Sequence, residues 1–441
     1  MSLINLSQYN MLKVLKESIG NTKFTKKMEC KLINMKKLIP FLLITVMVNF
    51  SSTAQLDYIH DNVIYKTLYP RDLKEFLISN PNVLLVDVRS PGEYSDTSRY
   101  GSLNIGRLRN SINIPIDSIE KQMSKLKSEI EKPIILYCSH SQRSRRVSKI
   151  LVESGFKNVY NLNGGMSWMN QADLINFPGK KELLENSLPF KSISAEDTRT
   201  LIKEKKKLVI IDIRTVSEYK SKDTIESNNF GRIKKSINIP EVDKKIDLAK
   251  IEKYRDRDIL IYDGNGALSY HVARYLTESG FKKVNTILGG IYSFIGNDKS
   301  TSAMRKELLE KTPRYKLLNV KESIDLLNSK KKVKIIDIRS SDEFNNLANR
   351  PWKKIGKLKN SVNLQPIEAS LKSCEIPKEK DAIIYVYGSD EATLFCKMLS
   401  DKGYKNVYCL STSFWSFIYT YANVPGFESI KGLMENYEGL Y

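Results

Sequence analysis

The sequence predicts an α/β protein built from three similar globular domains in tandem. The first observation is a phrase of apolar residues, an aspartate, an aliphatic residue and an arginine, which occurs at 84–89, 210–214 and 335–339. The second is that successive aspartates of this phrase are 125 residues apart. That period is too long for a solenoid repeat and suits a globular domain, which commonly holds ~100–150 residues. The copies around Asp87, Asp212 and Asp337 are called repeats 1, 2 and 3 below.

The third observation is that short apolar runs alternate with helical patterns inside each repeat. The runs of repeat 1 show no polar alternation, which is typical of strands buried on both faces of a parallel sheet. Between two of them, Val147, Ile150 and Leu151 recur at helical spacing. Each repeat is therefore expected to be a parallel sheet with helices on both faces. The runs of repeat 1 lie at 83–88, 133–136 and 159–162.

Shorter motifs recur in the same order after each of the three aspartates. A glutamate and an aromatic residue come first, a glycine-led phrase follows, and a glycine–aromatic–lysine phrase closes the repeat. The segments 177–189 and 298–313 are polar and charged and contain proline, so we interpret them as linkers. We leave the tail at 426–441 without a structural assignment. The expected domains are 63–178, 189–298 and 313–425.

The amino terminus resembles a secretory signal peptide. Two lysines follow Met35, an apolar run ends at Phe50, and small residues stand before Gln55. The run is too short to cross a membrane, which takes ~20 apolar residues. We expect cleavage near Ala54, export to the bacterial periplasm and no stable membrane span. Residues 1–54 would thus be an extension plus a signal peptide; either Met35 is the true start, or the residues before it form an amphipathic segment that holds the chain at a membrane.

The chain is basic, with a formal net charge of +21. Such a surplus can draw small anionic substrates towards a protein. The lysines are scattered through all three repeats and form no platform with aromatic residues, so we expect no nucleic-acid partner. A solvated, lysine-rich surface is the commonest reason for such a charge.

Four cysteines follow the expected cleavage site, too few for a disulfide framework. They show no paired spacing of metal ligands, so we expect no metal site. Cys396 and Cys409 fall on an expected helix and strand of repeat 3, where a buried cysteine behaves as a small hydrophobic residue. A disulfide within repeat 3 is the alternative in an oxidising compartment. The remaining two cysteines are Cys138 and Cys374.

Cys138 has the setting that points most directly to chemistry. It follows an apolar run and opens a polar loop that ends at Arg143, and a helix is expected from about Ser144. Backbone N–H groups at a helix amino terminus and a nearby arginine both stabilise negative charge on sulfur. We therefore interpret the loop as an anion cradle for a nucleophilic thiolate, with Cys138 and Arg143 as catalytic residues. The loop residues expected to bind substrate are Ser139, His140, Ser141, Gln142 and Ser144.

Together these motifs resemble rhodanese domains, the sulfurtransferase fold. The resemblance covers most of residues 63–425 as three copies, and it implies transfer of sulfane sulfur through a cysteine persulfide without a metal or organic cofactor. Four residues separate Cys138 from Arg143, which resembles rhodaneses acting on sulfane sulfur. The related cell-cycle phosphatases and arsenate reductases have one residue more, which makes room for phosphate or arsenate. The matching motifs in repeat 1 are 87–89, 93–94, Gly106, 112–115, 137–144, Gly164, Gly165 and Trp168.

Two positions depart from the usual rhodanese pattern. Many rhodanese loops have glycine where this chain has Ser141, and a glycine–histidine pair where it has Gly106 and Arg107. A positive φ at Ser141 would cost energy that glycine avoids. The resemblance favours thiosulfate as the donor, because the mercaptopyruvate-type loop ends without an arginine such as Arg143.

Repeats 2 and 3 show which residues the fold keeps when the cysteine is absent. Counting back from the closing glycines places Asp263 and Val386 at the cysteine position, and Leu268 and Glu391 at the arginine position. Neither repeat can form a persulfide there, so we expect both to be inactive. The residues with counterparts in every repeat, interpreted as a structural ionic network beneath the loop, are Asp87, Arg89 and Glu93.

The sequence favours a sulfurtransferase in which Cys138 takes sulfur from a small anionic donor such as thiosulfate and gives it to cyanide or a thiol. The alternative is a binding or scaffold protein, in which repeats 2 and 3 hold a protein partner and Cys138 at most carries sulfur. A redox or arsenate-type reductase would need a resolving cysteine, which repeat 1 lacks.

Overall fold

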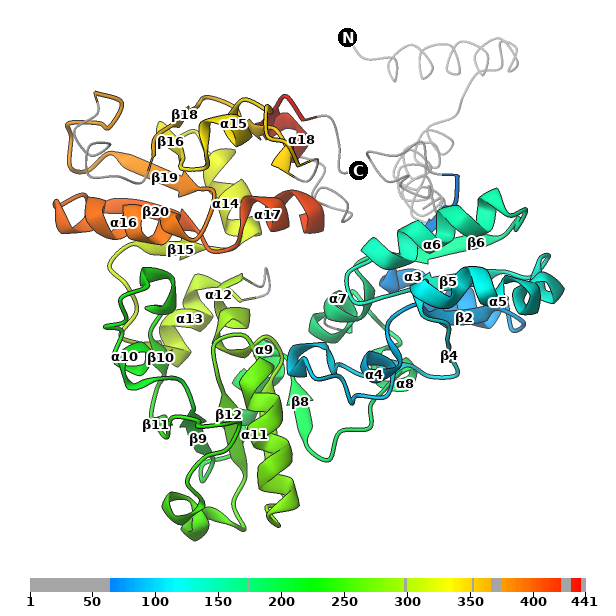
Figure 1. The fold of residues 1–441 in the computed structure, drawn as a ribbon. Coiled ribbons are helices and arrows are strands. Elements are labelled where there is room, and N and C mark those ends of the chain that lie inside the picture. The colour runs from blue at the N-terminus through cyan, green and yellow to red at the C-terminus, as the bar shows by residue number, and fades with distance from the viewer. Residues whose placement is uncertain are drawn as a thin grey trace, which may run out of the picture. The chain divides into compact units, whose positions relative to one another are not determined.

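The computed structural model describes residues 64–172, 174–296, 300–350, 353–365, 374–421 and 430–437 (Figure 1). The expected signal peptide, its cleavage site near Ala54 and the two alternative starts lie outside these residues. Within the described part of the chain, no helix is long and apolar enough to cross a membrane.

Each repeat contains one five-stranded parallel sheet, and the strand order is the same in all three, which confirms the predicted fold class. In repeat 1 the order is β1 (Lys66–Leu68), β6 (Val159–Leu162), β5 (Ile134–Tyr137), β2 (Leu84–Asp87) and β4 (Ile112–Asn113). In repeat 2 it is β8 (Lys191–Ile193), β13 (Val284–Ile287), β12 (Ile259–Tyr262), β9 (Val209–Asp212) and β11 (Ile237–Asn238). In repeat 3 it is β15 (Lys316–Leu318), β20 (Asn406–Leu410), β19 (Ile383–Tyr387), β16 (Val333–Asp337) and β18 (Ser361–Asn363).

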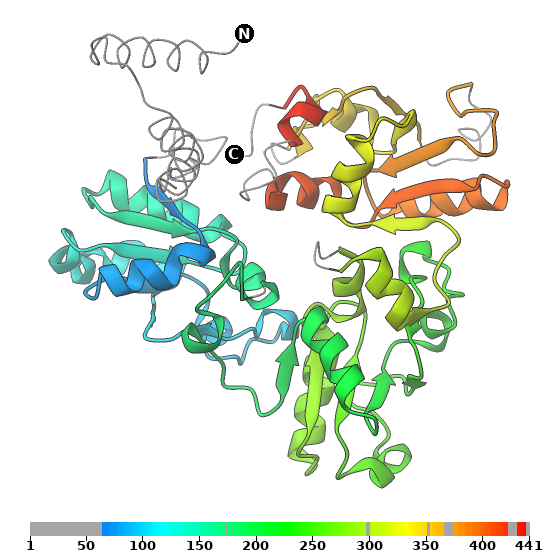
Figure 2. The same ribbon diagram turned by 180° about the vertical axis from the view of Figure 1, so that it is seen from behind.

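Helices cover both faces of the sheet in repeat 1. The side chains of β5 alternate: Ile134 and Leu136 pack into one core, and Ile135 and Tyr137 pack into the other. All four are fully buried, which explains why this strand shows no polar alternation. The first core is covered by α5 (Ile119–Leu126) and α6 (Gln142–Glu153), and the second by α3 (Pro70–Ser79) and α7 (Gly165–Gln171) (Figures 1 and 2).

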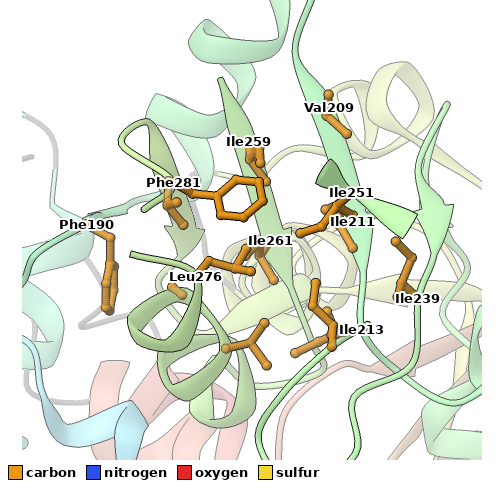
Figure 3. Close-up of a cluster of buried hydrophobic side chains, with 14 of the residues drawn as sticks. Phe190, Val209, Ile211, Ile213, Ile239, Ile251, Ile259, Ile261, Leu276 and Phe281 are labelled. Atoms are coloured by element: carbon orange, nitrogen blue, oxygen red, sulfur yellow. The ribbon is translucent and has the colours of Figure 1, made fainter. Parts of the chain in front are cut away.

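Repeat 2 is packed in the same way, with a core rich in isoleucine (Figure 3). Ile211 of β9 and Ile261 of β12 share this core with Phe281 and with Leu276 of α11 (Ala267–Glu278). The apolar runs of the sequence therefore form the interior of each repeat. Further helices among the described residues include α4 (Pro91–Tyr94), α9 (Ala195–Glu204), α10 (Val216–Tyr219), α12 (Ser293–Gly296), α14 (Val320–Leu327), α15 (Ser341–Phe344), α16 (Glu391–Asp401) and α17 (Phe414–Tyr421).

The segments interpreted as linkers, and part of the tail, are structured pieces of the repeats. In repeat 1, α8 (Lys180–Leu183) leads into β7 (Leu184–Glu185), which pairs antiparallel with β3 (Arg107–Leu108). Each repeat therefore extends beyond the boundary expected from the sequence, because a two-residue strand has no periodicity to detect. The counterparts are α13 (Ser302–Leu308) and β14 (Leu309–Glu310) paired with β10 (Arg232–Ile233), and α18 (Ile430–Leu433) and β21 (Met434–Glu435) paired with β17 (Lys357–Leu358).

A buried ion pair holds the glycine-led phrase against the sheet in every repeat. Arg89 Nη2 lies 2.6 Å from Asp87 Oδ2, and both side chains are fully buried. The same nitrogen donates to the carbonyl oxygen of Gly106 at 2.7 Å. Arg214 and Arg339 make the same bonds in repeats 2 and 3. The pair is present where the cysteine is absent, as a structural role predicts.

Candidate active site

Cys138 lies at the carboxyl-terminal edge of the parallel sheet, directly after β5, where open α/β sheets commonly bind ligands. The residue is 1% exposed. Helix α6 begins at Gln142, two residues earlier than expected, so Arg143 belongs to its first turn. The N–H groups of a first turn have no partner within the helix, and they can stabilise a negative charge at the loop.

Ser141 adopts the left-handed conformation that glycine would adopt more easily. Its φ is 69° and its ψ is −15°. Its hydroxyl donates to the carbonyl oxygen of Leu162 at 3.1 Å, and this hydrogen bond offsets part of the strain. In repeat 2 the equivalent residue is Gly266, with φ 84° and ψ 0°. The two loops therefore share one backbone conformation at this point.

Helix α7 fixes the other side of the loop. Met166 N donates to the carbonyl oxygen of Cys138 at 2.9 Å, and Ser167 N donates to that of Ser139 at 3.0 Å. Gly165 has φ +59°, and a Cβ atom there would lie 2.4 Å from the Cys138 carbonyl oxygen. This close approach explains why the helix begins with a glycine.

Arg143 closes the loop through a two-pronged ion pair with Glu93. Its Nη1 and Nη2 atoms each lie 2.7 Å from a carboxylate oxygen of Glu93, and Nη2 also donates to Ser139 Oγ at 3.0 Å. Burial alone would raise the pKa of Glu93, but the hydrogen bonds and charge of Arg143, with hydrogen bonds from Ser90, lower it below its ordinary value. Glu93 was expected in one ionic network beneath the loop; it forms a second pair that contacts the loop itself.

The other loop residues differ in exposure. Ser139 and Ser144 are buried, whereas Gln142 and His140 are exposed. His140 lines a cavity of about 240 Å³ together with Ser167 of α7. Partial burial, and then the positive charge of Arg143, lower the pKa of His140. Both effects favour the neutral form of the imidazole.

Asn161 is a supporting residue that the sequence analysis missed. Ser144 Oγ lies 2.6 Å from Asn161 Oδ1 and 3.6 Å from Cys138 Sγ. A hydroxyl has one hydrogen, so the Asn161 amide oxygen, the sulfur and the carbonyl oxygen of Ser141, 3.1 Å away, compete for it. A comparison of the three repeats could have identified Asn161. Strand pairing places Thr286 and Cys409 at the equivalent positions of repeats 2 and 3, so an asparagine occurs at this position only in the repeat that has the loop cysteine.

Repeat 2 shows what the loop holds when a carboxylate replaces the thiol. Asp263 Oδ1 accepts from Gly266 N at 2.7 Å and from Ser269 Oγ at 2.9 Å, and Oδ2 accepts from Leu268 N at 2.8 Å. Burial raises the pKa of Asp263 in spite of these hydrogen bonds. The equivalent donors in repeat 1 are the amides of Ser141 and Arg143 and the hydroxyl of Ser144.

In repeat 3 the residue at the cysteine position is Gly388, and the assignment of Val386 is wrong. The aspartate of the repeated phrase pairs with Tyr387, as it pairs in repeat 1 with Tyr137 directly before Cys138. Val386 is a core residue of β19. The stretch from this tyrosine to the closing glycine is two residues shorter in repeat 3, so counting back from the glycine overshoots.

A protein-family model for the rhodanese-like domain matches residues 70–172, 194–297 and 319–418. The matches cover more than half of the chain, with one in each repeat. The chain therefore belongs to the rhodanese-like domain family, and the three tandem copies expected from the sequence are confirmed.

Individual relatives match over short segments or at low identity. A tRNA uridine(34) hydroxylase of Hamiltonella defensa is 34% identical over 94 residues, which are 20% of this chain and 24% of the relative. The chain thus spans about a quarter of that relative's length. A thiosulfate sulfurtransferase structure from Pseudomonas aeruginosa matches 80% of this chain and 67% of its own, at 14% identity and a TM-score of 0.21. A rhodanese-related structure from Thermoplasma volcanium matches 24% of this chain and 91% of its own, at 30% identity and a TM-score of 0.20.

Proposed function

We propose that repeat 1 is a sulfurtransferase that holds sulfane sulfur as a persulfide on Cys138. The observation that carries this proposal is the carboxylate of Asp263 in the same loop of repeat 2, which accepts two backbone N–H groups and one hydroxyl. A carboxylate oxygen stands two bonds beyond Cβ, and so does the outer sulfur of a cysteine persulfide. The loop geometry therefore suits an anion of that reach.

The proposed reaction is a double displacement on sulfur. The Cys138 thiolate attacks the outer sulfur of thiosulfate, the S–S bond breaks, and sulfite leaves with the bonding electron pair. Cyanide or a thiolate then attacks the outer sulfur of the persulfide, and the Cys138 thiolate is released. The two steps balance without an oxidant or a cofactor, and they predict ping-pong kinetics.

Arg143 has two roles in this proposal. It holds the loop closed through Glu93 and Ser139, which uses three N–H groups of its guanidinium. A guanidinium has five N–H donors, so others can bind the sulfonate end of thiosulfate. The side chain of Arg143 is 26% exposed and can be reached from solvent, whereas Cys138 is almost fully buried. This difference in exposure favours a small donor.

The full chain tests the proposal in a thiosulfate-to-cyanide assay that measures thiocyanate. We expect turnover by the unaltered chain and by Cys374→Ser, because Cys374 lies in repeat 3 outside any loop of this kind. We expect none from Cys138→Ser. Turnover that survives in Cys138→Ser, or its absence with every sulfane donor tried, would remove the basis for the proposal.

We also propose a binding role for repeats 2 and 3. The loop of repeat 2 is filled by its own carboxylate, and that of repeat 3 has Gly388 in place of a thiol, which favours modules that hold a protein partner.

The chain would act after export to the bacterial periplasm. A mature chain that begins near Gln55 in a periplasmic extract supports export, and an intact amino terminus in the cytosol opposes it.

A further inference from the structure

Repeat 3 contains two buried cysteines that the proposed chemistry does not use. Cys396 is on α16 and Cys409 is on β20, and neither is exposed to solvent. Ala392, Phe395 and Leu399 share the inward face of α16 with Cys396 and pack into the same core. This spacing of three and four residues forms one stripe along the helix. Cys396 therefore faces the sheet.

Cys409 faces the helix from the opposite side. Along β20, Cys409 packs into the core that contains Cys396, while its neighbours Tyr408 and Leu410 pack into the core on the other face. Cys396 Sγ lies 3.8 Å from the carbonyl oxygen of Tyr408, the peptide directly before Cys409. Burial, and after it the neighbouring Cys409 thiol, raises the pKa of Cys396. Both are free thiols in the structure.

The other repeats show that the fold does not need cysteine at either position. The equivalents of Cys396 are Ser148 and Ala273, counted from the closing glycines. Strand pairing gives Asn161 and Thr286 as the equivalents of Cys409. Of the three repeats, only repeat 3 therefore has cysteines at both of these positions.

We propose that Cys396 and Cys409 form a disulfide that links α16 to β20 when the chain folds in the presence of a small disulfide such as oxidised glutathione. The two thiols lose their protons and one S–S bond forms between their Sγ atoms. The two electrons reduce one molecule of the oxidant to two thiols. The link forms during folding, because both sulfurs are sealed once the core has packed.

Folding the full chain in a glutathione buffer tests this proposal. After unfolding, alkylation without reductant and trypsin digestion, the two cysteines fall on separate peptides, 381–397 and 406–431. We expect these peptides to be joined, and Cys374→Ser and Cys138→Ser to leave them joined. The link should raise the unfolding midpoint of repeat 3 by about 5–10 °C over the reduced chain, since it constrains the unfolded state. The double variant Cys396→Ala, Cys409→Val should lose this dependence on oxidant.

The peptide map of the unaltered chain decides the outcome even if the double variant fails to fold. Alkylation of both Cys396 and Cys409 after folding with oxidised glutathione would overturn the proposal. So would a link from either one to Cys374 or Cys138 as the main product.

Discussion

The loops of repeats 1 and 2 have the same backbone turn and differ in the group that fills it. Ser141 and Gly266 are both left-handed, and each precedes a helix of 12 residues. In repeat 2 the carboxylate of Asp263 accepts three hydrogen bonds inside the turn. In repeat 1 the thiol of Cys138 stands at the equivalent position, 3.6 Å from Ser144 Oγ. Repeat 2 thus supplies its own carboxylate to these donors, whereas under the proposed function the same donors of repeat 1 would bind an anion that is built on sulfur.

A second difference concerns the glutamate that follows the repeated phrase. Glu93 and Glu218 both cap a short helix, α4 or α10, through a capping box. Glu93 also binds Arg143, whereas Leu268 stands at the arginine position of repeat 2 and cannot form the equivalent ion pair with Glu218. One residue type therefore has a role in the fold of both repeats and an added role at the loop of repeat 1.

The largest expected effect comes from making repeat 1 resemble repeat 2. Cys138→Asp should lower thiocyanate formation about a thousandfold or more, since the nucleophile is gone. The chain should still fold, because the carboxylate can accept from Ser141, Arg143 and Ser144, as Asp263 does from its counterparts. Hydrogen exchange, measured separately for the peptides of each repeat, shows whether the variant folds. Faster exchange throughout repeat 1 would show that the two loops are not equivalent.

Removing the buried carboxylate should show what the repeats share. Asp87→Ala leaves Arg89 buried without its ion partner, which should lower the free energy of unfolding of repeat 1 by about 3–5 kcal/mol. Asp212→Ala should cost repeat 2 a similar amount. Urea unfolding followed by repeat-specific exchange measures both. A loss in repeat 1 alone would assign this aspartate to the chemistry instead of the fold.

Replacing the glutamate by glutamine in repeat 1, but not in repeat 2, should affect sulfur transfer. Glu93→Gln should reduce sulfur transfer about tenfold and stability by about 1–2 kcal/mol, because it weakens a charged pair at the loop. Glu218→Gln, which loses a cap contact only, should leave transfer unchanged.

The ion pair between Glu93 and Arg143 predicts that the stability of repeat 1 depends on pH. The pKa of Glu93 is lowered in the folded state, so its stabilisation is complete above the ordinary value of about 4.3 and is lost as pH falls through the lowered value. Unfolding of repeat 1 in urea at several pH values measures this. Glu93→Gln should flatten the dependence below about pH 4, and an equal slope in the variant would exclude Glu93 as its source.

The smallest effect is expected at the left-handed residue. Ser141→Gly relieves strain but loses the hydrogen bond to Leu162, so the free energy of unfolding should change by less than about 1 kcal/mol. Gly266→Ala should destabilise repeat 2 by about 1–2 kcal/mol, since φ is positive and the new Cβ would lie 3.0 Å from Gly289 N. Thermal unfolding compares them. A large loss of stability in Ser141→Gly would mean that the hydrogen bond of the Ser141 hydroxyl contributes more to the stability of the loop than its backbone conformation does.

The sequence predicts most of the sheet and the place of Cys138 because both have local signals. Strands buried on both faces are apolar throughout, and the repetition shows which motifs belong to the fold. The closing strands such as β7 gave no signal, because two residues cannot show a period. The error at Val386 arose from a shortened loop, which only strand pairing reveals.

The partners within the site were harder to predict. Glu93 and Arg143 are 50 residues apart in the chain, and the glutamate recurs in every repeat, so repetition alone indicates a structural role. Asn161 was missed because an asparagine in an apolar strand resembles an ordinary buried polar residue. Its contact with Ser144 depends on the crossing of β6 beneath α6, which the sequence does not specify.

The most direct measurement is the mass of the full chain after incubation with thiosulfate, followed by peptide mapping of the added sulfur. If repeat 1 alone carries the chemistry, the chain gains about one sulfur atom on the peptide that contains Cys138. Cyanide should remove it, and Cys138→Ser should never acquire it. Sulfur on Cys374, Cys396 or Cys409, or no adduct with any sulfane donor, would contradict the assignment of repeat 1 as the sulfur-carrying repeat.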